Sequence, residues 1–193
     1  MLYIAYGSNI SSNRMHQRCP SARFVTKGFL EDTALCFHYY ANIEPVEGYT
    51  TPAVLWDIPE AEIRALDRAE GFPKHYSKEH HIFYPDPNVF FLIEDMQTRA
   101  EKMIDLVGAE NVHVARDFMD TPSGILGTAY VMTDWKKNEW EKHDQQTPIE
   151  YVEHLLAGYK EHGFDKEKGF GNWYLKALWY ALYRGEAPPE LRI

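Results

Sequence analysis

Short segments rich in aromatic and β-branched residues follow one another along the chain, and they do not alternate regularly with helices. Such segments predict β-strands when turn-forming residues bound them. The first, Leu2 to Tyr6, stops at Gly7-Ser8-Asn9, and Glu47-Gly48 is a later turn former. The others are Arg23 to Thr26, Ala34 to Tyr40, Ala53 to Ile58, Ser77 to Tyr84, Val112 to Ala115 and Ile125 to Met132. Because a βαβ alternation is missing, we expect an α+β domain whose sheet can close into a barrel.

Helical periodicity separates the strand segments. A helix after Pro59 carries Ile63 and Leu66 on its apolar face and is expected to end at Gly71-Phe72-Pro73, where glycine caps and proline stops it. Further helices are expected from Ser11 or Ser12 through Met15, between residues 89 and 107, at Pro148 to Glu161 and at Asn172 to Tyr183.

Length and composition restrict the class of protein and its partners. The 193 residues suit a single domain, residues 1–193, with a core that needs no disulfides. A hydrophobic content of 45% argues against disorder. The formal net charge of −9, without a run of Lys or Arg, argues against nucleic acid and anionic membranes as partners. Neither a signal peptide nor a membrane span is expected, because no basic leader or long apolar run is present.

Cysteine and histidine positions do not predict a metal site. Cys19 and Cys36 lack the spacing of a disulfide framework or a zinc motif, which suits a reducing cytoplasm. Cys36 has no basic neighbours in sequence, so a small core residue is expected rather than a reactive thiol. His75, His80 and His81 are close in sequence, but strand alternation sends the last two to opposite faces. We therefore expect no metal.

Glu70 is a candidate acid/base. It follows Ile63 by seven residues and Leu66 by four, so helical geometry turns it toward the apolar face. Burial and the negative end of the helix dipole are both expected to raise its pKa toward neutrality, where a carboxyl group can exchange protons. Alternatively, Glu70 is an ordinary helix-end residue that lies in water.

The loop Tyr6-Gly7-Ser8-Asn9 is a candidate binding site. Glycine allows close approach of a ligand, and successive backbone N–H groups can bind a carboxylate or an oxyanion. Ser8 lacks the flanking Gly-x-Ser-x-Gly of a nucleophile elbow, so a covalent nucleophile is not expected. Alternatively, the same composition forms only a turn.

Taken together, the two candidate features resemble the γ-glutamylcyclotransferase-like family. The resemblance rests on Tyr6-Gly7-Ser8-Asn9 and on Leu66-Asp67-Arg68-Ala69-Glu70-Gly71-Phe72-Pro73 with Tyr76. It continues in Met15-x-x-Arg18-Cys19-Pro20, Ala41-Asn42-Ile43, Ala129-Tyr130-Val131-Met132, and Pro148-x-x-Tyr151 with Gly158. These blocks keep the family's order over most of the chain.

The resemblance implies a small mixed β-barrel surrounded by helices, with a pocket at the loop after the first strand and with neither metal nor organic cofactor. It assigns Glu70 as the catalytic residue. The substrate-binding residues that it implies are Tyr6, Gly7, Ser8, Asn9, Ile10, Tyr76, Tyr130 and Tyr151. Each of the last three is equally well explained as a core tyrosine whose hydroxyl is satisfied.

The implied reaction is attack of a substrate's α-amine on its own γ-carbonyl, which forms 5-oxoproline and releases an amine or amino acid. The implied partner is a small γ-glutamyl compound. Alternatively, the fold is kept as a ligand-binding or regulatory module without turnover. An insertion is expected near residues 85–123, either covering the pocket, packed outside the domain, or forming the contact in a homodimer.

Overall fold

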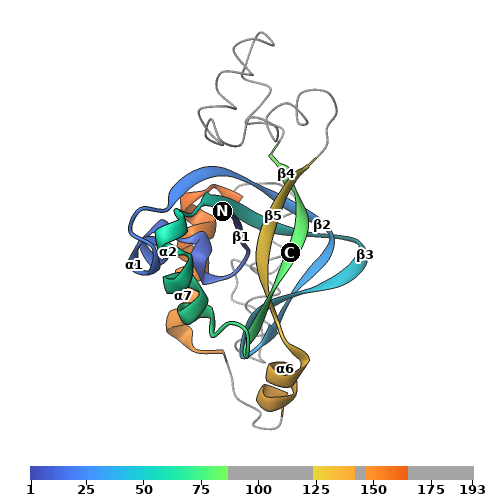
Figure 1. Ribbon diagram of the computed structural model, residues 1–193. Coiled ribbons are helices and arrows are strands. Elements are labelled where there is room, and N and C mark those ends of the chain that lie inside the picture. Colours follow the sequence, from blue (N-terminus) through green and yellow to red (C-terminus); the bar gives the residue numbers. More distant parts are fainter. Residues whose placement is uncertain (87–123, 142–146, 165–193) are drawn as a thin grey trace.

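The strands of the computed structural model, which describes residues 1–86, 124–141 and 147–164, form a closed barrel (Figure 1). Their bounds are β1 (Leu2–Ala5), β2 (Arg23–His38), β3 (Tyr40–Asp57), β4 (Tyr76–Pro85) and β5 (Ile125–Met132). In the order β1-β3-β2-β4-β5, neighbouring strands are antiparallel, and β5 closes the barrel by pairing parallel with β1. The expected mixed barrel is confirmed.

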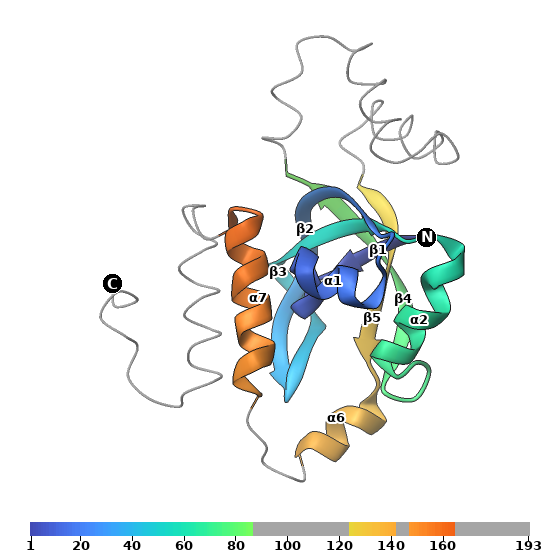
Figure 2. The ribbon, with the colours of Figure 1, turned by 90° about the vertical axis from the view of Figure 1, so that its left-hand side faces the viewer.

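Helices gather on one side of this barrel. Their bounds are η1 (Ser8–Ile10), α1 (Ser12–Arg18), α2 (Glu60–Glu70), α6 (Asp134–Glu141) and α7 (Ile149–Glu161). Figures 1 and 2 show α1, α2 and α7 on the same side, whereas α6 follows the end of β5. Helix α7 packs closely on η1, because a Cβ atom at Gly158 would lie 2.6 Å from Ile10 Cγ2. No described helix is both long and apolar enough to cross a membrane.

Successive side chains of β1 and β3 point to opposite faces of the sheet, and this divides the core into two layers. Tyr3 and Ala5 point toward the helices, together with Trp56 of β3. Ile4 points into the barrel, together with Leu55 of β3. A strand with both faces buried in this way is a nearly continuous apolar run, as Leu2–Ala5 is.

The two long strands differ from the expectation. Arg23 to Thr26 and Ala34 to Tyr40 were expected as separate strands, but the first and most of the second belong to the 16-residue β2. Glu47-Gly48 does not end a strand: it lies in an irregular segment inside β3, where the Gly48 N–H donates to Asp32 Oδ1 at 2.8 Å. The hairpin instead turns at Tyr39, which has a φ of 75°. Strand propensity missed this turn because tyrosine ordinarily favours strands.

The end of α2 agrees with the sequence. The Phe72 N–H donates to the Asp67 carbonyl at 2.9 Å and the Gly71 N–H to the Arg68 carbonyl at 3.2 Å, with Gly71 left-handed at a φ of 64°. This is a Schellman cap, which makes Glu70 the last helical residue. The strand expected at Val112 to Ala115, the helices expected at 89–107 and 172–183 and the insertion near 85–123 fall outside the described residues.

Candidate active site

A cavity of about 430 Å³ opens beside the loop that follows β1. Its volume suits a small molecule. The lining residues are Tyr3, Tyr6, Gly7, Ser8, Asn9, Arg14, Arg18, Tyr40, Ala41, Ala69, Glu70, His75, Tyr76, Tyr130, Lys136, Trp140 and Tyr151. The loop and the carboxylate singled out in the sequence therefore lie in one cavity.

Glu70 faces the cavity with a side chain that is only 13% exposed. Its Oε1 atom accepts a hydrogen bond from Arg18 Nη1 at 2.5 Å and another from Asn9 Nδ2 at 2.8 Å. No hydrogen bond to Oε2 is present among the described residues. Residue 70 is thus neither an ordinary surface glutamate nor an isolated buried one. The expectation from burial and helix dipole did not include this contact with an arginine.

Asn9 fixes the position of Glu70. It is 3% exposed, and its Nδ2 group donates both to Glu70 and, at 2.8 Å, to the Tyr3 hydroxyl. Its backbone carbonyl accepts the indole N–H of the buried Trp56 at 3.1 Å. A chain of buried groups therefore ties the loop to the barrel and orients one oxygen of the carboxylate, leaving the other available.

Tyr151 brings α7 into contact with the loop. Its hydroxyl oxygen accepts the Ser8 N–H at 3.4 Å and the Ala41 N–H at 3.2 Å. A Cβ atom at Gly7 would lie 2.6 Å from this oxygen, so only glycine leaves room for it. A hydroxyl has two acceptor sites and one proton, so with both sites engaged its remaining capacity is to donate. The Ser8 N–H, expected to face a ligand directly, instead bonds this hydroxyl.

The tyrosine hydroxyls of the cavity stay protonated at neutral pH. Burial is the main cause that raises the pKa of Tyr3, Tyr6 and Tyr76 well above the usual value. Burial likewise raises the pKa of Tyr151 to about 12. These groups can therefore donate hydrogen bonds but cannot serve as bases at neutrality. Glu70 is the one carboxylate in the described lining.

Cations outnumber this carboxylate around the cavity. Arg14 and Arg18 lie one turn apart on α1, and Lys136 comes from α6. Burial, with the nearby Arg18 charge, lowers the pKa of Arg14, and its Nε atom is buried with no hydrogen-bond partner in the described part of the chain. Lys136 also bonds Glu139 at 2.5 Å outside the lining. The net positive lining of an acidic protein favours an anionic ligand.

A second carboxylate, Asp67, lies on α2 one turn before Glu70. It accepts hydrogen bonds from the Tyr130 hydroxyl and, at 2.7 Å, from Lys78. Burial opposes ionisation of Asp67, but these two hydrogen bonds outweigh it and lower its pKa. The Tyr130 hydroxyl donates its hydrogen bond to Asp67 and is therefore not free to donate to a ligand.

Eight of the nine residues singled out in the sequence line the cavity: Glu70, Tyr6, Gly7, Ser8, Asn9, Tyr76, Tyr130 and Tyr151. Ile10 does not, because its side chain is fully buried in the core between the barrel and the helices. The Tyr6 hydroxyl donates to the Tyr130 carbonyl, and the Tyr76 hydroxyl donates to the Ala41 carbonyl at 3.4 Å. Both hydroxyls are thus satisfied within the protein, as the alternative interpretation held for Tyr76.

The sequence did not indicate several other lining residues. Arg18 was noted within a motif but not as a partner of Glu70, because the two are 52 positions apart in the sequence. Arg14 also carried no signal except its spacing of four from Arg18, which places both on one helix face. Lys136 and Trp140 belong to α6, a helix that was not expected, and Tyr40 was expected in a strand but not as part of a site.

Local sequence similarity connects the chain with proteins of known name, although no family model matches it. It is 34% identical over 82 residues to γ-glutamylcyclotransferase of Mus musculus and 33% identical over 82 residues to that of Bos taurus. Each alignment covers 36% of this chain and 44% of the relative. The chain thus aligns with less than half the length of these relatives.

The fold comparison covers nearly the whole chain. A solved structure of a γ-glutamyl cyclotransferase matches with a TM-score of 0.59 and 20% identity, over 99% of this chain and 95% of the other. At this identity the match establishes the fold alone. The chain is thus similar to γ-glutamylcyclotransferases over part of its sequence, and it shares the fold of a γ-glutamyl cyclotransferase.

Proposed function

We propose that the protein is an enzyme that cyclises the γ-glutamyl group of a small amide or dipeptide to 5-oxoproline and releases the amine. The observation that carries the proposal is the Glu70 carboxylate, which faces the cavity with one oxygen fixed by Arg18 and Asn9. The other oxygen is available to a substrate's ammonium group. The local similarity to γ-glutamylcyclotransferases supports the same reaction.

In the proposed reaction, Glu70 takes a proton from the substrate's α-ammonium group. The neutral amine attacks the γ-carbonyl carbon, and the resulting tetrahedral centre collapses by breaking the bond to the leaving nitrogen. Of the three protons on the ammonium, one stays on the lactam nitrogen and two end on the released amine as its ammonium form. Glu70 carries both protons to the leaving nitrogen, one taken before the attack and one taken from the attacking nitrogen after it, so the carboxylate is regenerated.

The Tyr151 hydroxyl is proposed to stabilise the oxyanion of the tetrahedral centre. It accepts two backbone N–H groups, and such bonds polarise the hydroxyl and strengthen the hydrogen bond that it donates. The attacking amine belongs to the substrate, so the enzyme needs no serine or cysteine nucleophile. What it supplies is a base, an oxyanion donor and a folded substrate conformation.

Arg14 and Lys136 are proposed to bind carboxylate groups of the substrate. A γ-glutamyl compound carries an α-carboxylate, and Arg18 already neutralises Glu70. The buried Arg14 Nε atom has an unused donor at the cavity. No metal takes part in this scheme, and the two free cysteines suit a reducing cytoplasm.

A binding module without turnover is the second candidate, and the Arg18–Glu70 ion pair favours it. A carboxylate held by an arginine at 2.5 Å can serve structure alone. Two features support the enzyme instead: the pair lines the cavity rather than the outer surface, and only one oxygen of the carboxylate is engaged among the described residues.

The test is a panel of γ-glutamyl amines and γ-glutamyl dipeptides, with 5-oxoproline release measured for the wild type and for Glu70→Gln. We expect release by the wild type and none by the variant. A matched control is Glu60→Gln, which makes the same change at an exposed position of the same helix and should retain activity. Calorimetry on the same panel separates the two candidates: ligands that bind without conversion support the binding module.

A further inference from the structure

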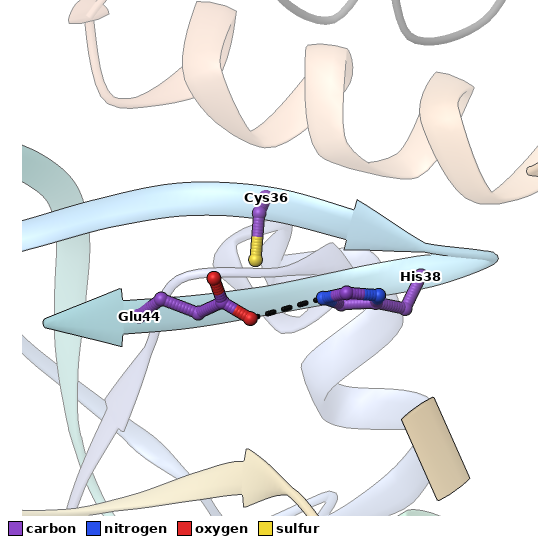
Figure 3. A group of neighbouring side chains, drawn as sticks. All are labelled: Cys36, His38 and Glu44. Atoms are coloured by element: carbon purple, nitrogen blue, oxygen red, sulfur yellow. Dashed lines mark hydrogen bonds and ion pairs between the residues drawn. The ribbon is translucent and has the colours of Figure 1, made fainter. Parts of the chain in front are cut away.

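Three potential metal ligands converge near the turn of the β2–β3 hairpin. Cys36 and His38 come from β2 and Glu44 from β3, and Figure 3 shows the thiol, the imidazole and the carboxylate pointing toward one another. Their ligand atoms all lie within 4.8 Å of one another, and His38 Nε2 is 3.0 Å from Glu44 Oε1. The sequence did not indicate this group because the turn at Tyr39 was not expected there.

We propose that Cys36, His38 and Glu44 form a zinc-binding site that leaves one coordination position open. Sulfur, imidazole nitrogen and carboxylate oxygen are the donor types that zinc accepts. In a tetrahedral zinc site the ligand atoms lie about 3.5 Å apart. The ligand atoms of Cys36, His38 and Glu44, now up to 4.8 Å apart, must therefore approach one another by about 1 Å, which side-chain rotation can supply. The Cys36 thiol releases its proton to solvent as the sulfur–metal bond forms.

Asn42 gives independent support for the site. It pairs with Cys36 in the hairpin register, it is fully buried, and its Nδ2 atom has no hydrogen-bond partner within the described part of the chain. Its Oδ1 atom is fixed by the Met132 N–H at 2.8 Å. A metal-bound thiolate is a good acceptor for a neighbouring amide N–H, and such outer contacts commonly support metal ligands. The buried donor would gain a partner when zinc binds.

Among the described residues, Lys137 is the cation that contacts the group. Its Nζ atom is 3.4 Å from Glu44 Oε1, but it also lies 3.7 Å from Asp134, to which it can turn when Glu44 binds the metal. The site would therefore connect the hairpin with α6. Because Tyr40 follows directly after the turn and lines the cavity, bound zinc would stiffen one wall of the cavity without supplying a reacting group.

The test uses metal alone, so it does not depend on turnover. Chelator-treated protein is titrated with Co²⁺, whose bond to a thiolate gives a near-ultraviolet charge-transfer band, and the cobalt is then displaced by Zn²⁺. We expect one equivalent of metal and a thiolate band that disappears when zinc is added. A wild-type protein without this band overturns the proposal.

Variants assign the ligands. Cys36→Ser should remove the band, and His38→Ala and Glu44→Gln should each weaken zinc binding by about 10-fold or more. Two controls should behave as wild type: Cys19→Ala, which changes the other cysteine, and Glu47→Gln, which changes an exposed carboxylate of the same strand. A band that survives Cys36→Ser, or that is lost in Cys19→Ala, contradicts the assignment.

Discussion

Replacing Tyr151 by phenylalanine removes one oxygen and leaves the ring that packs against Tyr40 at a centroid distance of 4.9 Å. The Ser8 and Ala41 N–H groups lose their acceptor. An unsatisfied buried donor costs about 1–3 kcal/mol, and the adjoining cavity lets a water approach, so we expect a total of about 2 kcal/mol. For a domain of this size, that lowers Tm by about 4–8 °C.

The same substitution removes the proposed oxyanion donor. Loss of one such donor lowers kcat by about 100-fold to 1,000-fold, while KM changes less because the interaction forms only in the transition state. Thermal unfolding and steady-state release of 5-oxoproline measure the two effects separately. Tyr40→Phe is a matched control for stability, because the Tyr40 hydroxyl makes no hydrogen bond among the described residues.

Two results would refute the reasoning. If kcat of Tyr151→Phe stays within about threefold of the wild type, the hydroxyl does not stabilise the transition state. If Tm falls no further than in Tyr40→Phe, the two N–H groups do not depend on the hydroxyl for a partner.

Three further substitutions follow from the geometry. Gly7→Ala places a Cβ atom 2.6 Å from the Tyr151 oxygen, so the loop must move, and we expect kcat/KM to fall by about 100-fold; unchanged kinetics would contradict the contact. Arg14→Gln should raise KM about 10-fold for substrates with carboxylate groups and leave kcat nearly unchanged, as measured at low ionic strength; an equal loss in kcat would argue against a binding role. Asp67→Asn should flatten the acid side of the stability curve measured by urea unfolding between pH 6 and pH 3. Burial opposes ionisation of Asp67, but its hydrogen bonds, foremost the one from Lys78, lower its pKa in the folded protein. The stabilisation is therefore present above the unfolded pKa of about 4 and is lost as the pH falls through the folded pKa; parallel stability curves for Asp67→Asn and the wild type would contradict this.

Local signals in the sequence were sufficient for the features that depend on a few neighbouring residues. The glycine-proline stop gave the end of α2, and the spacing from Ile63 and Leu66 gave the inward direction of Glu70. The turn composition after Leu2 to Tyr6 gave the loop. Each depends on backbone preferences that act within about one helical turn.

Contacts between distant segments were beyond the same reasoning. Nothing in α1 or α2 by itself indicates that Arg18 meets Glu70, because that contact depends on how two helices pack on the barrel. The hairpin turn at Tyr39 was also missed, because tyrosine there takes a left-handed conformation against its strand preference. The chemistry at both places could be seen only after the strands were paired.

The shortest strand of the barrel joins partners from distant parts of the chain. β1 pairs with β3 on one side and with β5, about 120 residues later, on the other. The loop that holds Asn9 is continuous with β1, and Tyr151 reaches it from α7, which follows β5. A nascent chain on the ribosome therefore has Glu70, the proposed base, long before it has a complete pocket. Ligand binding should begin only after α7 has been synthesised, so substrate cannot assist the earlier steps of folding.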